Sequence, residues 1–284
     1  MDFTINKPEK LIKAIIHTVQ GMSFGSAQKA IRLGKIKVNN KRVKDNVNLS
    51  VGDIVSVYEF NKSKPTVPII YEDDNIIIVN KPQGIECATR DKSLNNTYSL
   101  EEILEEHSAI VVHRLDRLTE GIVVLAKSKE IATKFEKIFR TREIDKFYQA
   151  AVVGVPKNTG VLKAYLKKNA NSALVDISNE EKPNYKEIIT EIDILEDYKQ
   201  YSILDIKLHT GRTHQIRAHM AHLGHHIIGD NKYGSNSNIL ENNNYKGYYL
   251  TAYKIVFNIT DKQLEYLNNL NIEIQPTWKT NIKN

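Results

Sequence analysis

The stretch "VVHRLDRLTEGIVVLAK", residues 111–127, decides how the larger part of this chain is interpreted. Its two apolar runs have the composition of buried strands, and between them lies a polar segment with Asp116 flanked by Arg114 and Arg117. Loops that leave a sheet are where a rigid scaffold presents reactive groups. The stretch therefore predicts a functional carboxylate on a loop, although capping of a turn or surface pairing with the arginines also accounts for Asp116.

Similar apolar runs recur downstream of residue 69, where most patterns indicate strands and a few indicate helices. The clearest strand patterns lie at 75–84 and 201–209, and helical patterns lie at 99–107, 128–142 and 212–224. We therefore expect an α+β fold whose mixed, largely antiparallel sheet is flanked by helices. The Asn-rich stretch at 231–247 has neither period and is expected to form a surface loop.

The distribution of charge separates the first 60 residues from the rest. Residues 1–60 hold ten Lys or Arg against five Asp or Glu, whereas residues 61–284 hold 30 against 29. This asymmetry is typical of a small domain that binds a polyanion such as nucleic acid, although a lysine-rich surface explains it equally well. The segment "YEFNKSKPTVPI" has two prolines and no period, which indicates a linker. We expect a small domain at 1–60, a linker at 61–68 and a larger domain at 69–284.

One cysteine and the lack of a long apolar run restrict the class of protein. A single cysteine, Cys87, excludes an internal disulfide framework and a cysteine-rich zinc site, and it fits a reducing compartment. No apolar run approaches the roughly 20 residues of a membrane helix, and the opening "MDFTINKPEK" lacks the apolar core of a secretory signal. We expect a cytoplasmic protein with no membrane partner.

The first domain is predicted to contain a helix followed by a tight hairpin. Apolar spacing in "SAQKAIRLG" indicates a helix that stops at Gly34, and "KIKVNNKRV" indicates a hairpin because two Asn tolerate the positive φ angles of its turn. Six cations would line the helix and hairpin at a spacing suited to phosphates: Lys29, Arg32, Lys35, Lys37, Lys41 and Arg42.

Residues 10–58 resemble the alpha-L RNA-binding motif, an S4-like module. The resemblance rests on a pattern of basic residues, Gly, Val-Asn and a later Gly-Asp, which here are Arg32, Gly34, Val38, Asn39, Gly52 and Asp53. It implies a small α/β domain that binds RNA. The opening "EKLIKAI" departs from the Arg-Leu-Asp with which the motif usually begins.

A second polar constellation lies at residues 208–234, "LHTGRTHQIRAHMAHLGHHIIGDNKYG". Apolar residues at helical spacing predict a helix that is stopped by Gly224. Arg212 and His214 would lie near its start, where free amide groups and the helix dipole favour anions such as phosphate. Arg217 points away from the apolar stripe, so it can form a bidentate pair with a carboxylate from another loop.

Six of the nine histidines fall within residues 209–226, so a metal site has to be weighed. Three of them would share a helical face only if the helix continued past Gly224, and the cluster contains no Glu to serve as the base of a metallohydrolase. A metal-dependent nuclease is therefore an alternative that metal analysis tests. Polar surface and RNA contact explain the histidines more simply, and we expect no metal ion.

The segment "TREIDKFYQAAVVG", residues 141–154, is predicted to form a strand. Tyr148 and Lys146 share one of its faces, and a tyrosine among small residues can stack on a flat base. A half-buried core tyrosine explains the same pattern.

Four segments in this order resemble the RluA-type pseudouridine synthases: "NKPQG", "HRLDRLTEGIVVLAK", "KFYQAAVVG" and the constellation at 208–234. The resemblance runs from about Ile69 to Phe257. It implies an isomerase that detaches uracil from its ribose within an RNA chain, rotates the base and rejoins it through carbon 5, with no metal or organic cofactor. Its partner would be RNA, ribosomal or else transfer RNA, and the enzyme is expected to be a monomer.

The resemblance also implies roles for individual residues. Asp116 matches the catalytic aspartate, Arg217 the basic residue that pairs with it, and Tyr148 the tyrosine that packs on the target uracil and is implicated in removing its carbon 5 proton. Arg114 matches the arginine that helps to occupy the space left by the flipped nucleotide. Further RNA contacts are expected from Arg117, Lys146, Arg212 and His214.

Two departures from the family pattern lie near the proposed chemistry. The usual loop reads Arg-Leu-Asp-Arg-Asp-Thr-Ser-Gly, and here Leu118 and Glu120 replace its second acid and its serine. Thr251 stands where a histidine is frequent. Glu120 is expected to add negative charge near the RNA path. A non-catalytic RNA-binding or ribosome-assembly protein on the same fold is the alternative function, but binding alone requires none of the three catalytic candidates.

Overall fold

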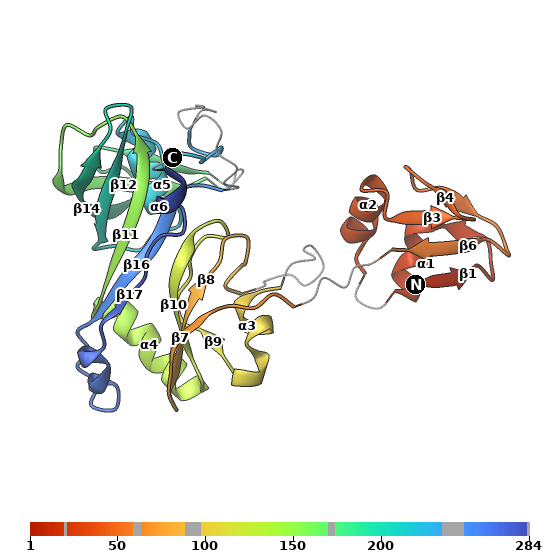
Figure 1. Cartoon of the computed structure of the whole chain (residues 1–284), viewed down its shortest axis with the longest axis horizontal. Coiled ribbons are helices and arrows are strands. Elements are labelled where there is room, and N and C mark those ends of the chain that lie inside the picture. The colour runs from red at the N-terminus through yellow and green to blue at the C-terminus, as the bar shows by residue number, and fades with distance from the viewer. Residues whose placement is uncertain (20–21, 59–63, 89–97, 170–173, 235–246, 283–284) are drawn as a thin grey trace. The chain divides into compact units, whose positions relative to one another are not determined.

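The computed structural model describes residues 1–19, 22–58, 64–88, 98–169, 174–234 and 247–282 (Figure 1). The chain divides into two compact units, the first formed by Met1–Thr66 with Thr89–Ser99 and the second by Val67–Ala88 with Leu100–Asn284. Within the described ranges, every helix is too short or too polar to cross a membrane.

The first unit combines two helices with short antiparallel strands around one apolar core (Figure 1). Its elements are β1 (Asp2–Thr4), β2 (Glu9–Lys10), α1 (Leu11–Thr18), α2 (Phe24–Arg32), β3 (Ile36–Val38), β4 (Lys41–Arg42), β5 (Asn48–Leu49) and β6 (Ile54–Val57). The main sheet has the order β1-β6-β3-β4, and β2 pairs with β5.

The predicted helix and hairpin of this unit are confirmed. Helix α2 begins after Ser23, whose Oγ accepts a hydrogen bond from the N–H of Ser26 at 3.2 Å, and Gly34 just past its end has φ +68°. Asn39 and Asn40 form the turn between β3 and β4 with φ of 49° and 64°. These positive angles match the type of turn that two-residue hairpins prefer.

The second unit is built on a large sheet with helices against it. Its elements are β7 (Ile69–Glu72), β8 (Ile76–Lys81), α3 (Leu100–Ile103), η1 (Glu105–His107), β9 (Ile110–Val111), β10 (Glu120–Ala126), α4 (Lys129–Thr141), β11 (Ile144–Val153), β12 (Gly160–Lys168), β13 (Val175–Ser178), β14 (Lys186–Asp197), β15 (Tyr201–Leu208), α5 (Gln215–His222), β16 (Leu250–Phe257), η2 (Glu265–Asn269), β17 (Ile272–Glu273) and α6 (Lys279–Ile282).

The order of strands confirms the predicted α+β class. The sheet runs β13-β12-β14-β15-β11-β16-β10-β8-β7, with β9 beside β10 and β17 beside β16. The pairing of β10 with β16 is parallel, and every other pairing that the structure describes in this sheet is antiparallel. Helices α4 and α5 form where the helical patterns at 128–142 and 212–224 predict them. The pattern at 99–107 forms two short helices, α3 and η1, instead of one.

Both faces of β8 and β10 are buried, which explains their continuous apolar runs. Successive residues of β8 and β10 enter opposite cores, with Ile77, Val79, Val123 and Leu125 in one and Ile76, Ile78, Ile122 and Val124 in the other. The amphipathic helix α4 covers the second core with Ile131, Phe135 and Ile138. The first core includes Tyr148, Leu115 from the Asp116 loop and residues of α5. The Asp116 loop and the segment at 208–234 therefore lie on the same face of the sheet.

Gly121 lets β10 approach β16 closely where the polar loop ends. It has φ +124° and lies opposite Ala252 in the parallel register. A Cβ atom at this position would overlap the backbone of Ala252, and glycine alone avoids the overlap. The loop is therefore fixed against β16 at its end. Most of the surface loop predicted at 231–247 lies outside the described residues.

Candidate active site

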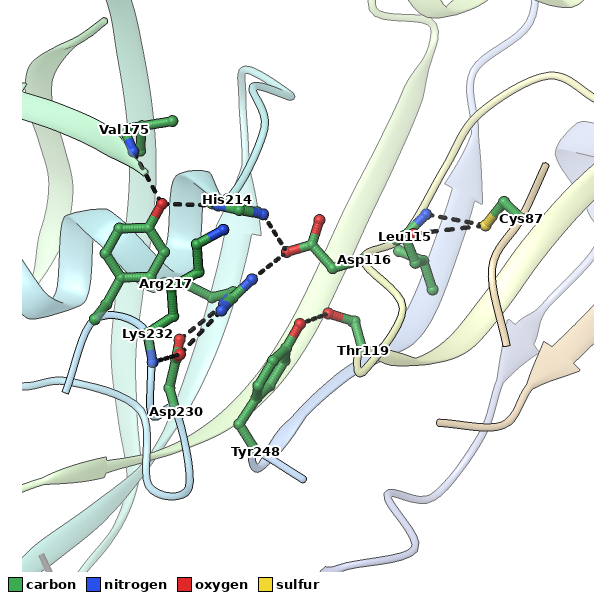
Figure 2. Close-up of polar contacts among 11 residues, drawn as sticks. Cys87, Leu115, Asp116, Thr119, Val175, His214, Arg217, Asp230, Lys232 and Tyr248 are labelled. Atoms are coloured by element: carbon green, nitrogen blue, oxygen red, sulfur yellow. Dashed lines mark hydrogen bonds and ion pairs between the residues drawn. The ribbon is translucent and has the colours of Figure 1, made fainter. Parts of the chain in front are cut away.

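Asp116 lies between β9 and β10 in a loop that hydrogen bonds hold on both sides of it (Figure 2). On one side, Leu115 is buried and its N–H donates to Cys87 Sγ at 3.3 Å. On the other, the N–H of Thr119 donates to the carbonyl oxygen of Asp116 at 3.0 Å, and Thr119 Oγ1 lies 3.1 Å from the hydroxyl of Tyr248. The carboxylate is therefore presented by a firmly held loop.

Two titratable side chains, Lys81 and His113, also fix this loop. Lys81 is fully buried, and its Nζ donates to three backbone carbonyls, one of them that of Arg117 at 3.2 Å. Burial lowers the pKa of Lys81 to about 8. His113 Nε2 accepts a hydrogen bond from the N–H of Val124 at 2.9 Å, and burial lowers the pKa of His113 to about 3, so near pH 7 the ring is neutral and can accept.

Arg217 connects the loop to the second polar constellation. Its Nη1 donates to Asp116 Oδ2 at 2.9 Å, and its Nε and Nη2 donate to the two carboxylate oxygens of Asp230 at 2.7 and 2.9 Å (Figure 2). Burial opposes the charge on Arg217, but hydrogen bonds and charge from Asp230, with Asp116, raise its pKa above the ordinary value. Burial alone would raise the pKa of Asp230, and its bonds to Arg217 hold that pKa below the usual range. The buried guanidinium of Arg217 thus forms ion pairs with both Asp116 and Asp230.

Two tyrosine rings enclose the guanidinium group. Its central carbon lies 4.4 Å from the ring centroid of Tyr248 and 5.2 Å from that of Tyr233. Burial raises the pKa of both tyrosines, so their hydroxyls remain protonated near pH 7. The rings and Asp230 together orient the arginine so that one N–H is directed at Asp116.

A pocket opens beside Asp116, and separate parts of the second unit form its walls. Besides Asp116 these walls include Arg114, Tyr148, Arg212, His214, Arg217 and Leu250. Tyr148 lies on β11 and is 7% exposed, and burial raises the pKa of its hydroxyl. An aromatic ring and leucines next to a carboxylate suit a flat, partly polar ligand such as a nucleobase.

The structure brings most of the predicted site residues together. The three catalytic candidates line the pocket, as do Arg114, Arg212 and His214. Arg117 is exposed and is not among the lining residues, and the Nζ of Lys146 lies 5.6 Å from the ring centroid of Phe139. The assignment of these side chains to catalysis or RNA contact stays a prediction.

The expectation that Glu120 places negative charge near the RNA path is wrong. Its side chain is buried, and it accepts hydrogen bonds from Thr251 Oγ1 and Thr277 Oγ1, each at 2.6 Å, and from the N–H of Thr277 at 2.9 Å. Trp278 Nε1 donates to the same Thr251 Oγ1 at 2.8 Å. Because neighbouring side chains of a strand point to opposite faces, the residue that departs from the family loop binds the C-terminal segment instead of facing the pocket.

Three residues of the site, Asp230, Tyr233 and Tyr248, were not identified from the sequence. Asp230 follows two buried isoleucines and a glycine. An acid directly after a short apolar run is a pattern that could have identified it as a candidate site residue. The tyrosines have no such signal. Their contact with Arg217 depends on where separate chain segments meet.

The clustered histidines bond to separate partners. His219 Nδ1 lies 3.0 Å from Thr190 Oγ1, His222 Nε2 lies 2.8 Å from an oxygen of Asn179, and His225 Nδ1 donates to a backbone carbonyl at 2.9 Å. Burial lowers the pKa of His219 to about 4. Within the described part of the chain, no group of three His, Cys, Asp or Glu side chains is placed to hold a metal ion.

Comparison with known proteins gives a consistent result. A family model described as RNA pseudouridylate synthase matches residues 75–222. An uncharacterized RNA pseudouridine synthase of Mycoplasma capricolum is 33% identical, over 97% of this chain and 98% of its own length. Ribosomal large subunit pseudouridine synthase C of Vibrio vulnificus is 34% identical, over 72% of this chain and 70% of its own length. The structure of human RNA pseudouridylate synthase domain containing 1 shares the fold with a TM-score of 0.59 and 23% identity, over 76% of this chain and 86% of that one.

Proposed function

Because the chain belongs to the RNA pseudouridylate synthase family, it is an RNA-modifying isomerase, and we propose that Asp116 is its nucleophile and ribosomal RNA its substrate. Isomerisation of uridine to pseudouridine exchanges the N1–C1′ bond for a C5–C1′ bond, while carbon 5 loses a proton and N1 gains one. A nucleophile that forms a transient covalent bond, to the sugar or to the base, splits this exchange into easier steps. The Asp116 carboxylate, which lines the pocket, is suited to that role.

One contact carries the assignment: Arg217 Nη1 lies 2.9 Å from Asp116 Oδ2, in the pocket that Tyr148 also lines. A guanidinium stabilises a carboxylate where water is excluded and is not consumed by the reaction. The Tyr148 ring offers a surface for an extruded uracil, and stacking there offsets part of the few kcal/mol that base flipping costs. A non-catalytic RNA-binding protein would need none of these groups, so that function is not favoured.

The substrate can be tested by mapping pseudouridine in cells that lack this protein. We expect pseudouridine to disappear from one or a few positions of ribosomal RNA, because relatives are named for the large ribosomal subunit. Restoring the wild-type gene should restore the modification, and restoring Asp116→Asn should not. Loss confined to transfer RNA would contradict the proposed substrate, whereas rescue by Asp116→Asn would contradict the proposed nucleophile.

We also propose that the first unit is an S4-like RNA-binding module. Lys29 and Arg32 of α2 line a pocket together with Lys44, a cation that the sequence pattern had not marked. Lys37 Nζ lies 4.8 Å from the ring centroid of Tyr58, which is exposed. Lys35, Lys41 and Arg42 on the neighbouring segments are exposed as well. Cations beside an exposed aromatic ring suit the phosphates and bases of RNA.

Salt dependence measures the contribution of these cations. In the variant Lys29→Gln/Arg32→Gln/Lys44→Gln, the slope of log Kd against log salt should fall by about 2 to 3, because each lost phosphate contact removes about 0.7 to 0.9 from it. The matched control Lys7→Gln/Lys10→Gln/Lys13→Gln makes the same change of charge on other exposed lysines of the unit. Binding of transcribed ribosomal RNA fragments at several salt concentrations gives both slopes. Equal slopes for the two variants would contradict the module's role.

We further propose that the enzyme acts as a monomer in the cytoplasm. The named walls of the pocket all come from the second unit of one chain, which supports a site that needs no partner subunit. The single cysteine is buried, which supports a reducing compartment.

A further inference from the structure

The two oxygens of the Asp116 carboxylate have different surroundings. Oδ2 lies 2.9 Å from Arg217 Nη1 and 3.7 Å from His214 Nε2. Among the described residues, no hydrogen bond reaches Oδ1, and Figure 2 shows both contacts converging on the same oxygen. One oxygen is therefore held by nitrogen groups and the other is left for a ligand.

The contacts of the other ring nitrogen of His214 favour one tautomer. Nδ1 lies 2.7 Å from the hydroxyl of Tyr233, and that hydroxyl oxygen already accepts a hydrogen bond from the N–H of Val175 at 3.0 Å. The hydroxyl hydrogen is thus available to Nδ1. A neutral imidazole that accepts at Nδ1 has its hydrogen on Nε2, the atom that faces Asp116.

Burial and charge support the neutral form of His214. Burial lowers the pKa of this ring, Asp116 acts in the opposite direction, and Arg217 and Lys232 lower the pKa further. Asp230, which also faces the group, raises it. The net direction is downward, so the ring has one hydrogen at neutral pH and a fixed donor direction.

The backbone of His214 has an unusual conformation that aims the ring. The residue occupies the position before α5 with φ 55° and ψ 20°, yet its side chain makes no capping bond to the helix. The turn is held instead by Gln215, whose Oε1 accepts from Thr210 Oγ1 at 2.9 Å and from the N–H of Arg212 at 3.1 Å. A left-handed histidine is uncommon and carries a strain cost, so its persistence without a capping role indicates another use.

We propose that His214, oriented by Tyr233, is a positioning residue that directs an Nε2–H at Asp116 Oδ2, so that Oδ1 is the oxygen that attacks the nucleoside. This inference rests on the proposed role of Asp116 as nucleophile. It differs from the phosphate contact that the sequence predicts for His214. The separation of 3.7 Å exceeds a hydrogen bond, and contacts of this kind commonly tighten when substrate binds.

A pair of amide substitutions tests the proposal, because Gln places an N–H near the position of Nε2 and Asn places one near Nδ1. We expect His214→Gln to retain at least about a third of kcat and His214→Asn to lose about 10- to 100-fold, with KM nearly unchanged in both. Tyr233→Phe should lower kcat by about 10-fold because the ring is no longer oriented. His222→Gln, at an exposed histidine of the same helix bonded to Asn179, serves as the control and should match wild type.

Three measurements separate the possible outcomes. Steady-state kinetics on an RNA fragment give kcat and KM, and the fluorescence of Trp278 shows whether each variant is folded. Equal kcat for the Gln and Asn variants would overturn the positioning role, and a rise in KM with unchanged kcat would assign His214 to phosphate binding instead. If Asp116→Asn were as active as wild type, the proposed nucleophile itself would fail, independently of the His214 series.

Discussion

Asp116→Asn is expected to lower kcat for pseudouridine formation by at least about 1,000-fold, because an amide cannot act as the nucleophile that a carboxylate provides. RNA affinity should be nearly unchanged, since the amide has almost the same shape as the carboxylate. Tritium release from RNA labelled at carbon 5 of uracil measures turnover, and filter binding measures affinity.

The variant is expected to fold, which makes the experiment informative. Arg217 keeps its bidentate pair with Asp230 when Asp116 loses its charge, so no buried cation is left without a partner. Asp193→Asn makes the same substitution on an exposed part of β14 and should behave as wild type. Turnover of Asp116→Asn at the rate of the Asp193→Asn control would exclude Asp116 as the nucleophile.

Arg217→Gln should affect stability and catalysis together. The Asp230 side chain is only 1% exposed, so removing its cation leaves a buried carboxylate unpaired, at a cost of about 3 to 5 kcal/mol in the free energy of unfolding. Trp278 is the single tryptophan and is fully buried in the second unit, so its fluorescence during urea denaturation reports on that unit. Lys163→Gln breaks an exposed ion pair with Glu187 and should cost less than about 1 kcal/mol.

A second substitution separates the two roles of Arg217. In Arg217→Gln/Asp230→Asn the buried charge is gone as well, so we expect about 2 kcal/mol or more of the lost stability to return. Activity should stay at the level of Arg217→Gln, because Asp116 still lacks its guanidinium partner. Recovery of activity along with stability would show that Arg217 supports the fold alone and contributes nothing to the reacting carboxylate.

Local patterns were sufficient to predict the central strands of the second unit and the helices α4 and α5, but strands β12, β13 and β14 were not predicted. Buried strands such as β10 are continuous apolar runs, and α4 has both the amphipathic spacing and the Ser128 cap that a helix start requires. The carboxylate on the loop after β9 and the arginine on α5 could also be predicted, since each follows directly from its local context. The contact between them could be predicted only through the resemblance to a family.

Properties that depend on the meeting of distant segments could not be predicted in this way. The contacts of Asp230 and Tyr248 with Arg217 depend on tertiary packing and not on local sequence. The expectation that Glu120 adds negative charge near the RNA path was wrong, because the parallel pairing of β10 with β16 turns its side chain toward Thr251 and the C-terminal segment. Chain order contains no simple signal of that pairing.

Glu120 and Thr251 lie opposite each other in this parallel register and share a hydrogen bond. Both differ from the serine and the histidine that are frequent at these positions in RluA-type enzymes. A serine at 120 is shorter than the glutamate that contacts Thr277, and a histidine at 251 would remove the Thr251 hydroxyl that both Glu120 and Trp278 contact. The two substitutions are therefore expected to be coupled in descent: lineages with a glutamate at the first position should have a small hydroxyl residue at the second.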